Sequence, residues 1–357
     1  MTEELIYQEI LDTPQAILDT IASSRPVAEV IAEEMHRRSI RRLFLIGNGT
    51  SYYSSLAAAY SGRLLGKPGA IQFYPMMAGD FRHFTPALNE HDAIIGISAS
   101  GEFRDVLAVF ERWNVEILCV GITQVPGSSI TRLASHTLLA GGGQSRVSVM
   151  TKTYASTLTA AHLLVLAAAR APQETFQDLQ GCAAICEEGI QAAELAIPAI
   201  LPQIAGFEHA FHFGAGPAYA ACLESALKMK EMAILHAEGA ETWEMASGSA
   251  IILDERSLCV ALYSAGAGDS STADTARHAR RWGARVLEIG PQAVAGDMHI
   301  PVSSPQYDMF TSLCLVPPLA LLAYRLAKSR GYDPDRPAWS KRYTDQGMSH
   351  AMGQEKA

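Results

Sequence analysis

The sequence has few charged residues, and acidic side chains outnumber basic ones. Charged residues make up 18% of the 357 residues, and 37 acidic against 28 basic side chains give a formal net charge of −9. Such a chain lacks the positive surface that neutralises nucleic-acid phosphates, so nucleic-acid binding is excluded. Because 48% of the residues are hydrophobic, the chain can form sizeable cores. Its length suits two domains of about 150 residues each.

Long apolar runs, a leader sequence and paired cysteines are also lacking. The longest apolar runs, around 158–169 and 313–324, are shorter than the roughly 18–20 residues needed to cross a membrane. The N-terminus is acidic, with no basic stretch before an apolar segment. We therefore expect no membrane segment, a cytoplasmic location and free cysteines. The histidines and cysteines show no ligand spacing, so we expect neither a metal nor a cofactor.

Short apolar runs alternate with helical patterns along the chain. Strands are predicted in the first half at 41–47, 70–74, 92–98 and 115–122, and in the second half at 210–216, 258–264 and 285–289. Helical periodicity covers 14–38, 52–65, 102–113 and 151–171. Gly47 and Gly49 match Gly214 and Gly216 at a constant offset of 167 residues. The pattern predicts a duplicated α/β domain in which each parallel sheet is covered by helices on both faces.

The domain boundaries follow from this repeat. We expect an N-terminal helical segment (1–34), a first α/β domain (35–175), a linker helix (176–203), a second α/β domain (204–345) and a C-terminal tail (346–357). Proline disrupts helix interiors, so we expect Pro198 and Pro202 to end the linker helix.

Two loops rich in glycine and hydroxyl groups follow predicted strands of the first half. Gly47-Asn-Gly-Thr-Ser51 follows the first strand, and Ser98-Ala-Ser-Gly-Glu102 follows a later core strand. Ligands bind at the carboxyl ends of parallel strands, where backbone amides and hydroxyls can donate to an anion. Two such loops, on strands that can be neighbours in one sheet, suggest a phosphate site, although an ordinary helix cap explains each loop alone. The dinucleotide fingerprint and the P-loop lysine are both absent.

A second candidate site lies on the predicted helix after Gly216. Glu224, Lys228 and Glu231 are spaced i, i+4, i+7, which places them on one helical face. A carboxylate in a buried setting can act as a general base. The alternative is a surface ion-pair ladder, and the spacing alone favours that alternative.

These motifs resemble those of the sugar isomerase (SIS) domain family, in the two-domain arrangement of the isomerase half of glucosamine-6-phosphate synthase. Residues 47–52 resemble the family's Cys-Gly-Thr-Ser-Tyr, and residues 98–102 resemble its Ser-Gln-Ser-Gly-Glu. Further segments that resemble family motifs are 9–17, 125–130, 149–152, 223–231, 236–238 and 333–337, together with Lys341. The resemblance implies two tandem SIS domains, each a doubly wound, flavodoxin-like, three-layer fold.

The resemblance also implies roles for particular residues. Those expected to hold a sugar phosphate are Gly49, Thr50, Ser51, Ser98, Ala99 and Ser100. Glu231 would move a proton between C1 and C2 of an open-chain sugar, and Lys341 would lie near the sugar hydroxyls. The residues with implied supporting roles are Glu224, Lys228, His236 and Ser247. A homodimer is implied too, with the loop around 236–248 reaching the neighbouring subunit's site.

Several positions depart from the family pattern. Ser247 stands where the family has a histidine that opens the sugar ring, and serine is not an acid–base group near pH 7. Asn48, Ala99 and Phe103 replace a cysteine, a glutamine and a threonine of the family motifs.

Two functions therefore stay open. The first is an isomerase, deaminase or deglycase that acts on an amino-sugar or fructosamine phosphate without glutaminase activity. The second is a non-catalytic sugar-phosphate sensor. Glu231 and Lys341 favour the enzyme, whereas Ser247 favours the sensor.

Overall fold

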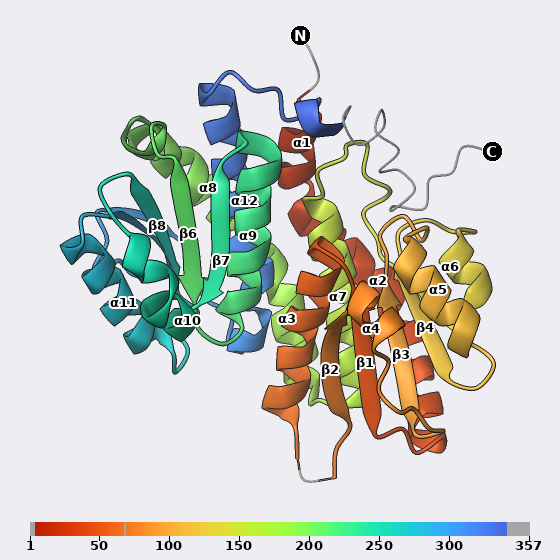
Figure 1. The fold of residues 1–357 in the computed structure, drawn as a ribbon. Helices are drawn as coiled ribbons and strands as arrows, with labels where there is room; N and C mark the ends of the chain where they lie inside the picture. The colour runs from red at the N-terminus through yellow and green to blue at the C-terminus, as the bar shows by residue number, and fades with distance from the viewer. Residues whose placement is uncertain (1–3, 68, 341–357) are drawn as a thin grey trace. The chain divides into compact units, whose positions relative to one another are not determined.

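Two compact units make up the protein, each built on a five-stranded parallel sheet (Figure 1). The computed structural model describes residues 4–67 and 69–340. The first unit comprises Gln15–Arg146 and Lys152–Gln180, together with the residues from Ala338 on. The second unit comprises Val147–Thr151 and Gly181–Pro337, together with the N-terminal residues up to Pro14. Lys341 and the predicted tail 346–357 lie outside the described residues.

The sheet of the first unit has the strand order β2-β1-β3-β4-β5. Its strands are β1 (Arg42–Gly47), β2 (Gln72–Met77), β3 (Asp92–Ile97), β4 (Leu118–Thr123) and β5 (His136–Leu139). Its helices are α2 (Thr13–Arg37), α3 (Thr50–Leu65), α4 (Ala78–His83), α5 (Arg104–Trp113), α6 (Ser129–Leu133) and α7 (Lys152–Ala168). Helices α3 and α7 pack together on one face of the sheet, and α4, α5 and α6 pack on the other.

The second sheet repeats this topology with the order β10-β9-β8-β6-β7. Its strands are β6 (His209–Gly214), β7 (His236–Glu241), β8 (Ser257–Leu262), β9 (Arg285–Gly290) and β10 (Met298–Pro301). The remaining helices are α1 (Leu5–Leu11), α8 (Gln173–Ile204), α9 (Ala218–Ala233), α10 (Thr242–Ser247), η1 (Ser249–Ile252), α11 (Asp269–Arg281), η2 (Asp308–Phe310) and α12 (Thr311–Ser329). Helices α9 and α12 cover one face of the sheet, and α10 and α11 cover the other.

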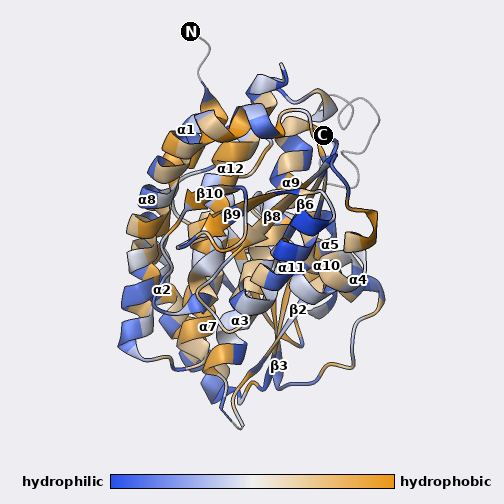
Figure 2. Ribbon diagram, turned by 90° about the vertical axis from the view of Figure 1, so that its left-hand side faces the viewer, coloured by the Kyte–Doolittle hydropathy of each residue, from blue (hydrophilic) through white to orange (hydrophobic). Residues whose placement is uncertain are grey.

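The predicted fold class is confirmed, because both units are doubly wound three-layer α/β domains. Strands β1 and β6 occupy the same relative positions, with the 167-residue offset that the sequence shows. Figure 2 shows α11 largely in blue, as its polar composition requires for a helix that turns one side to solvent. All six cysteines are free, as predicted, and all six are buried.

The prediction of a loop around 236–248 is wrong. Residues 236–241 form β7, an edge strand paired with β6, and α10 follows it directly. The segment is rich in alanine, glutamate and glycine, which are poor strand formers, so its composition hides the strand. Pairing with β6 and the burial of Ala237 and Ala240 stabilise it, while His236 and Glu238 stay exposed.

The prediction that prolines end the linker helix is also wrong. Helix α8 continues through Pro198 and Pro202 to Ile204. Each proline removes one backbone hydrogen bond, but the buried side chains of Ile197, Ile200 and Ile204 hold the helix in place.

The apolar run at 313–324 lies inside a helix that extends beyond the run at both ends. Helix α12 passes through Pro317 and Pro318, and the segment Asp308–Ser329 is long and apolar enough to cross a membrane. However, 94% of the most apolar 18-residue stretch of this segment is buried inside the protein, which is typical of a core helix. The cytoplasmic location stays a prediction.

Each unit buries one histidine against a serine hydroxyl. His162 Nδ1 of α7 lies 2.8 Å from Ser61 Oγ of α3, and His212 Nδ1 of β6 lies 2.8 Å from Ser225 Oγ of α9. Burial disfavours the charged imidazole and lowers the pKa of both histidines to about 3. The positive charge of Lys230 also lowers the pKa of His212.

We expect acidification from pH 7.5 to 5 to destabilise the protein through these two histidines. An unfolded histidine has a pKa of about 6.5, so in this range the unfolded chain takes up protons that the folded chain does not. Stability therefore falls as the pH falls, by about 2 kcal/mol per histidine. Urea unfolding should show that His162→Gln and His212→Gln each lose less free energy of unfolding between pH 7.5 and 5 than the wild type does. The variant His83→Gln, at an exposed position, should lose as much as the wild type. An unchanged pH dependence in both variants would contradict this account.

Candidate active site

The two hydroxyl-rich loops of the first unit lie next to each other at the carboxyl edge of the sheet. Strand β1 pairs with β3 in parallel, with Ile46 opposite Gly96, and β2 lies on the other side of β1. The chain therefore leaves β1 and β3 toward opposite sides, which is the switch point where open α/β sheets bind ligands. The expectation that the two loops follow neighbouring strands is confirmed.

The loop after β1 brings the first turn of α3 close to the strand end. A Cβ atom on Gly47 would lie 2.6 Å from the Ser51 carbonyl carbon, so this approach requires glycine. Gly49 has φ +53°, a left-handed conformation that glycine adopts without strain. Thr50 and Ser51 then begin α3, where the amides and hydroxyls of the first turn can donate to an anion.

The loop after β3 is shaped by its own serines. Ser98 Oγ accepts the Phe103 N–H at 3.3 Å, and Ser100 Oγ accepts the Glu102 N–H at 3.2 Å. A hydroxyl that accepts one hydrogen bond still has its own O–H to donate. The Ala99 carbonyl accepts hydrogen bonds from the Thr123 hydroxyl and the Gln124 N–H, at the end of β4. Ala99 therefore links the loop to the next strand.

A charged network at the same edge was not predicted from the sequence. Asp105, in the first turn of α5, accepts from Arg82 Nη1 at 3.0 Å and from Asn48 Nδ2 at 3.3 Å. Arg82 lies on α4, a short helix that periodicity does not reveal. The network fixes the side chain of Asn48 beside the β1 loop, and the arginine charge is balanced by Asp105.

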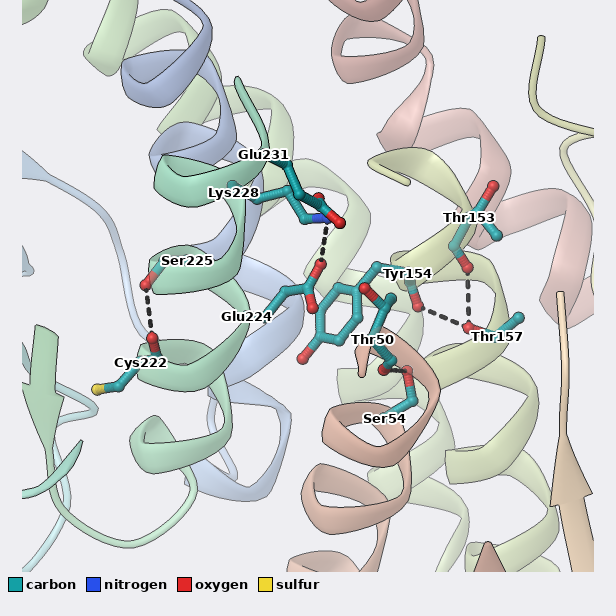
Figure 3. Close-up of polar contacts among 10 residues, drawn as sticks. All are labelled: Thr50, Ser54, Thr153, Tyr154, Thr157, Cys222, Glu224, Ser225, Lys228 and Glu231. Carbon is teal, nitrogen blue, oxygen red and sulfur yellow. Dashed lines mark hydrogen bonds and ion pairs between the residues drawn. The ribbon is translucent and has the colours of Figure 1, made fainter. Parts of the chain in front are cut away.

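The second unit carries the glutamate–lysine cluster on α9 (Figure 3). Lys228 Nζ lies 3.1 Å from Glu224 Oε1 and 2.5 Å from Glu231 Oε2. The side chains of Glu224 and Lys228 are 0% and 1% exposed. The surface-ladder interpretation is therefore wrong, because two of the three side chains are buried. Burial alone would lower the pKa of Lys228, but the two carboxylates outweigh it and raise that pKa.

Glu231 differs from its two neighbours in exposure. Its side chain is 22% exposed, so of the three it is the one that can reach a ligand. The ammonium of Lys228 holds the carboxylate in one orientation by a charge-assisted hydrogen bond. The arrangement suits a positioned carboxylate base whose partner cation is itself fixed by Glu224.

His236 and Ser247 make other contacts within the second unit. His236 begins β7, and its ring packs edge-on against His209 of β6 at 5.5 Å. Ser247 is the last residue of α10 and is exposed, and its hydroxyl donates to the Trp243 carbonyl at 2.7 Å. Their supporting roles stay predictions, as does the role of Lys341, which lies outside the described residues. Within 4–67 and 69–340 no group of three or more potential ligand side chains could hold a metal ion.

Comparison with known proteins finds relatives over most of the chain. The SIS domain model matches residues 38–167 and 203–291. Glutamine–fructose-6-phosphate aminotransferase (isomerizing) of Methanothermobacter thermautotrophicus is 33% identical over 346 residues, which cover 94% of this chain and 56% of that protein. The corresponding protein of Gloeobacter violaceus is 30% identical, with 93% and 57% covered. The chain thus spans little more than half the length of these curated relatives.

Solved structures share the fold at lower sequence identity. The C-terminal domain of glucosamine-fructose-6-phosphate aminotransferase from Francisella tularensis superposes with a TM-score of 0.85 at 21% identity, covering 94% of this chain and 99% of that one. Tagatose-6-phosphate ketose/aldose isomerase from Escherichia coli gives a TM-score of 0.76 at 22% identity, covering 94% and 95%.

Proposed function

Because the chain belongs to the SIS domain family, we propose that it binds a phosphorylated sugar and transfers a proton between C1 and C2 of the open-chain form. The substrate class is an amino-sugar or fructosamine phosphate, and the reaction is that of an isomerase, deaminase or deglycase. The pairing of β1 with β3 is the observation that carries the proposal, because it brings two donor-rich loops to the ligand-binding edge of the sheet.

In this proposal the first unit binds the phosphate. The hydroxyls of Thr50, Ser51, Ser98 and Ser100 donate to the phosphate oxygens, and the positive end of the α3 dipole favours the negative charge. Gly49 lets the backbone approach the anion, and Ala99 can contribute only through its backbone.

We expect Ser51→Ala combined with Ser100→Ala to weaken phosphosugar binding far more than binding of the same sugar without phosphate. Each lost hydrogen bond to a charged group costs about 1.5–3 kcal/mol. Isothermal titration calorimetry with both ligands measures the difference. The control Ser135→Ala removes an exposed hydroxyl just before β5, at the opposite edge, and should change neither affinity. Equal losses for the two ligands would place the phosphate elsewhere.

Glu231 of the second unit is the proposed base. A proton on a carbon next to a carbonyl or imine is acidic enough for a carboxylate to remove, and the same carboxylate can return it to the neighbouring carbon. The hydrogen bond from Lys228 keeps the Glu231 carboxylate oriented during both steps. The proposed role of Lys341 is to contact the sugar hydroxyls.

A thermal-shift screen tests the proposed ligand class. Hexose phosphates and amino-hexose phosphates should raise Tm, because a ligand that binds only the folded state stabilises it. Product detection on each ligand that binds then identifies the reaction. Absence of a shift with every phosphosugar would refute the proposal.

A sugar-phosphate sensor is the second candidate. It is favoured by Ser247, whose exposed hydroxyl donates a hydrogen bond to the Trp243 carbonyl of the same helix. A serine hydroxyl is not an acid–base group near pH 7. Tight binding of a phosphosugar without turnover of any cyclic or open-chain form would select the sensor over the enzyme.

We also propose a homodimer. Trp243, Ile251 and Ile252 are large apolar side chains exposed on α10 and η1, directly after β7. Clustered exposed apolar residues are typical of interaction surfaces, and twofold dimers are the commonest soluble oligomers. Light scattering at micromolar concentration should give a dimer mass for the wild type and a monomer mass for Ile251→Asp. A monomeric wild type would contradict the proposed dimer.

A further inference from the structure

Helices α3 and α7 of the first unit run in the same direction and begin at the same level. Ser61, twelfth residue of α3, contacts His162, eleventh residue of α7, at 2.8 Å. Both helices rise by about 1.5 Å per residue, so their first turns lie side by side. Figure 3 shows the two first turns, with Thr50 of α3 beside Tyr154 of α7. Two helix N-termini therefore point toward the edge that carries the Ser98–Ser100 loop.

Gln124 connects the loop after β3 to the first turn of α7, and its side chain has a buried donor without a partner among the described residues. It follows β4, its backbone N–H donates to the Ala99 carbonyl at 3.0 Å, and its Oε1 accepts from Thr153 Oγ1 at 2.9 Å. The side-chain amide thus lies between the β3 loop and the first turn of α7. The residue is 7% exposed, and its Nε2 group has no hydrogen-bond partner among residues 4–67 and 69–340. A buried unpaired donor is costly, so a ligand oxygen that pairs with it would be strongly favoured.

Lys152 provides a positive charge in the same turn. It is the first residue of α7, one position before Thr153, and is 8% exposed. Within the described part of the chain, its ammonium forms no ion pair or hydrogen bond. A buried cation normally has an anionic partner. Arg82, the cation of the charged network, is already paired with Asp105.

We propose that Gln124 and Lys152 bind the phosphate of the sugar ligand together with the hydroxyls of the two loops. This inference rests on the proposed function and extends it. The Gln124 amide donates one hydrogen bond to a phosphate oxygen, and Lys152 supplies the positive charge that hydroxyls and amides lack. The two residues thus select a phosphorylated sugar over its neutral counterpart.

The test compares binding of fructose 6-phosphate, inorganic phosphate and fructose by calorimetry. Lys152→Met should lower the affinity for the two phosphate ligands about 10- to 100-fold, leave fructose unchanged and reduce the salt dependence of binding. Lys67→Met is the matched control, because it removes an exposed lysine beyond the opposite end of α3. Lys152→Arg, which keeps the charge, should retain most of the affinity.

A second variant keeps the inference testable if Lys152→Met does not fold. Gln124→Glu has nearly the same shape and can still accept from Thr153, but it places a negative charge beside the phosphate. It should lose at least about tenfold in phosphate affinity, and Gln72→Glu, at the exposed start of β2, should not. Wild-type affinity in both Lys152→Met and Gln124→Glu, or equal losses for fructose, would overturn the inference. A wild type that binds none of the three ligands would instead refute the proposed function.

Discussion

Glu231→Gln should lower kcat by about 10²–10⁴ and leave KM little changed. Glutamine keeps the size of glutamate and can still contact Lys228, but it cannot accept a proton from carbon. The loss therefore falls on the chemical step and spares ground-state binding. Steady-state kinetics on whichever phosphosugar the thermal-shift screen identifies measures both constants.

Glu208→Gln provides the control for this experiment. Glu208 is exposed just before β6, so the same chemical change there should leave kcat and KM as in the wild type. Calorimetry should show that Glu231→Gln binds the phosphosugar with nearly wild-type affinity. Full turnover by Glu231→Gln would exclude this residue as the base.

Lys228→Met should destabilise the second unit by about 3–5 kcal/mol, the usual cost of breaking a buried ion pair by removing one partner. Methionine fills similar space, so the loss is electrostatic: Glu224 is fully buried and would face Glu231 without the cation between them. Urea unfolding monitored by circular dichroism measures the change in the free energy of unfolding.

Lys230→Met is the matched control, because Lys230 lies two residues away on the exposed side of α9. Its effect should stay within about 0.5 kcal/mol. A loss below about 1 kcal/mol at neutral pH would show that the cluster is better solvated than its burial indicates.

Local sequence patterns were enough to predict the duplicated α/β fold and the two donor-rich loops. Strands and helices differ in hydrophobic period, and that period is carried by neighbouring residues along the chain. Gly47 and Gly49 mark a turn for an equally local reason, since a close approach and a positive φ require glycine at those positions. The 167-residue offset between the halves is a property of the sequence alone.

Burial and strand adjacency were decided by the tertiary structure. The spacing of Glu224, Lys228 and Glu231 places them on one face of a helix but cannot tell whether that face meets solvent, and it is largely buried. Strand β7 forms although its residues are poor strand formers, and α8 continues although it contains prolines. In both cases contacts with residues distant in sequence outweigh the local propensity. Gln124 was missed because an unsatisfied buried donor is recognisable only when every neighbouring acceptor is known, and Lys152 was missed because only the folded chain shows that it is buried. Hydrogen-bond satisfaction and desolvation depend on contacts between residues far apart in the chain, so they emerge only when the chain has folded.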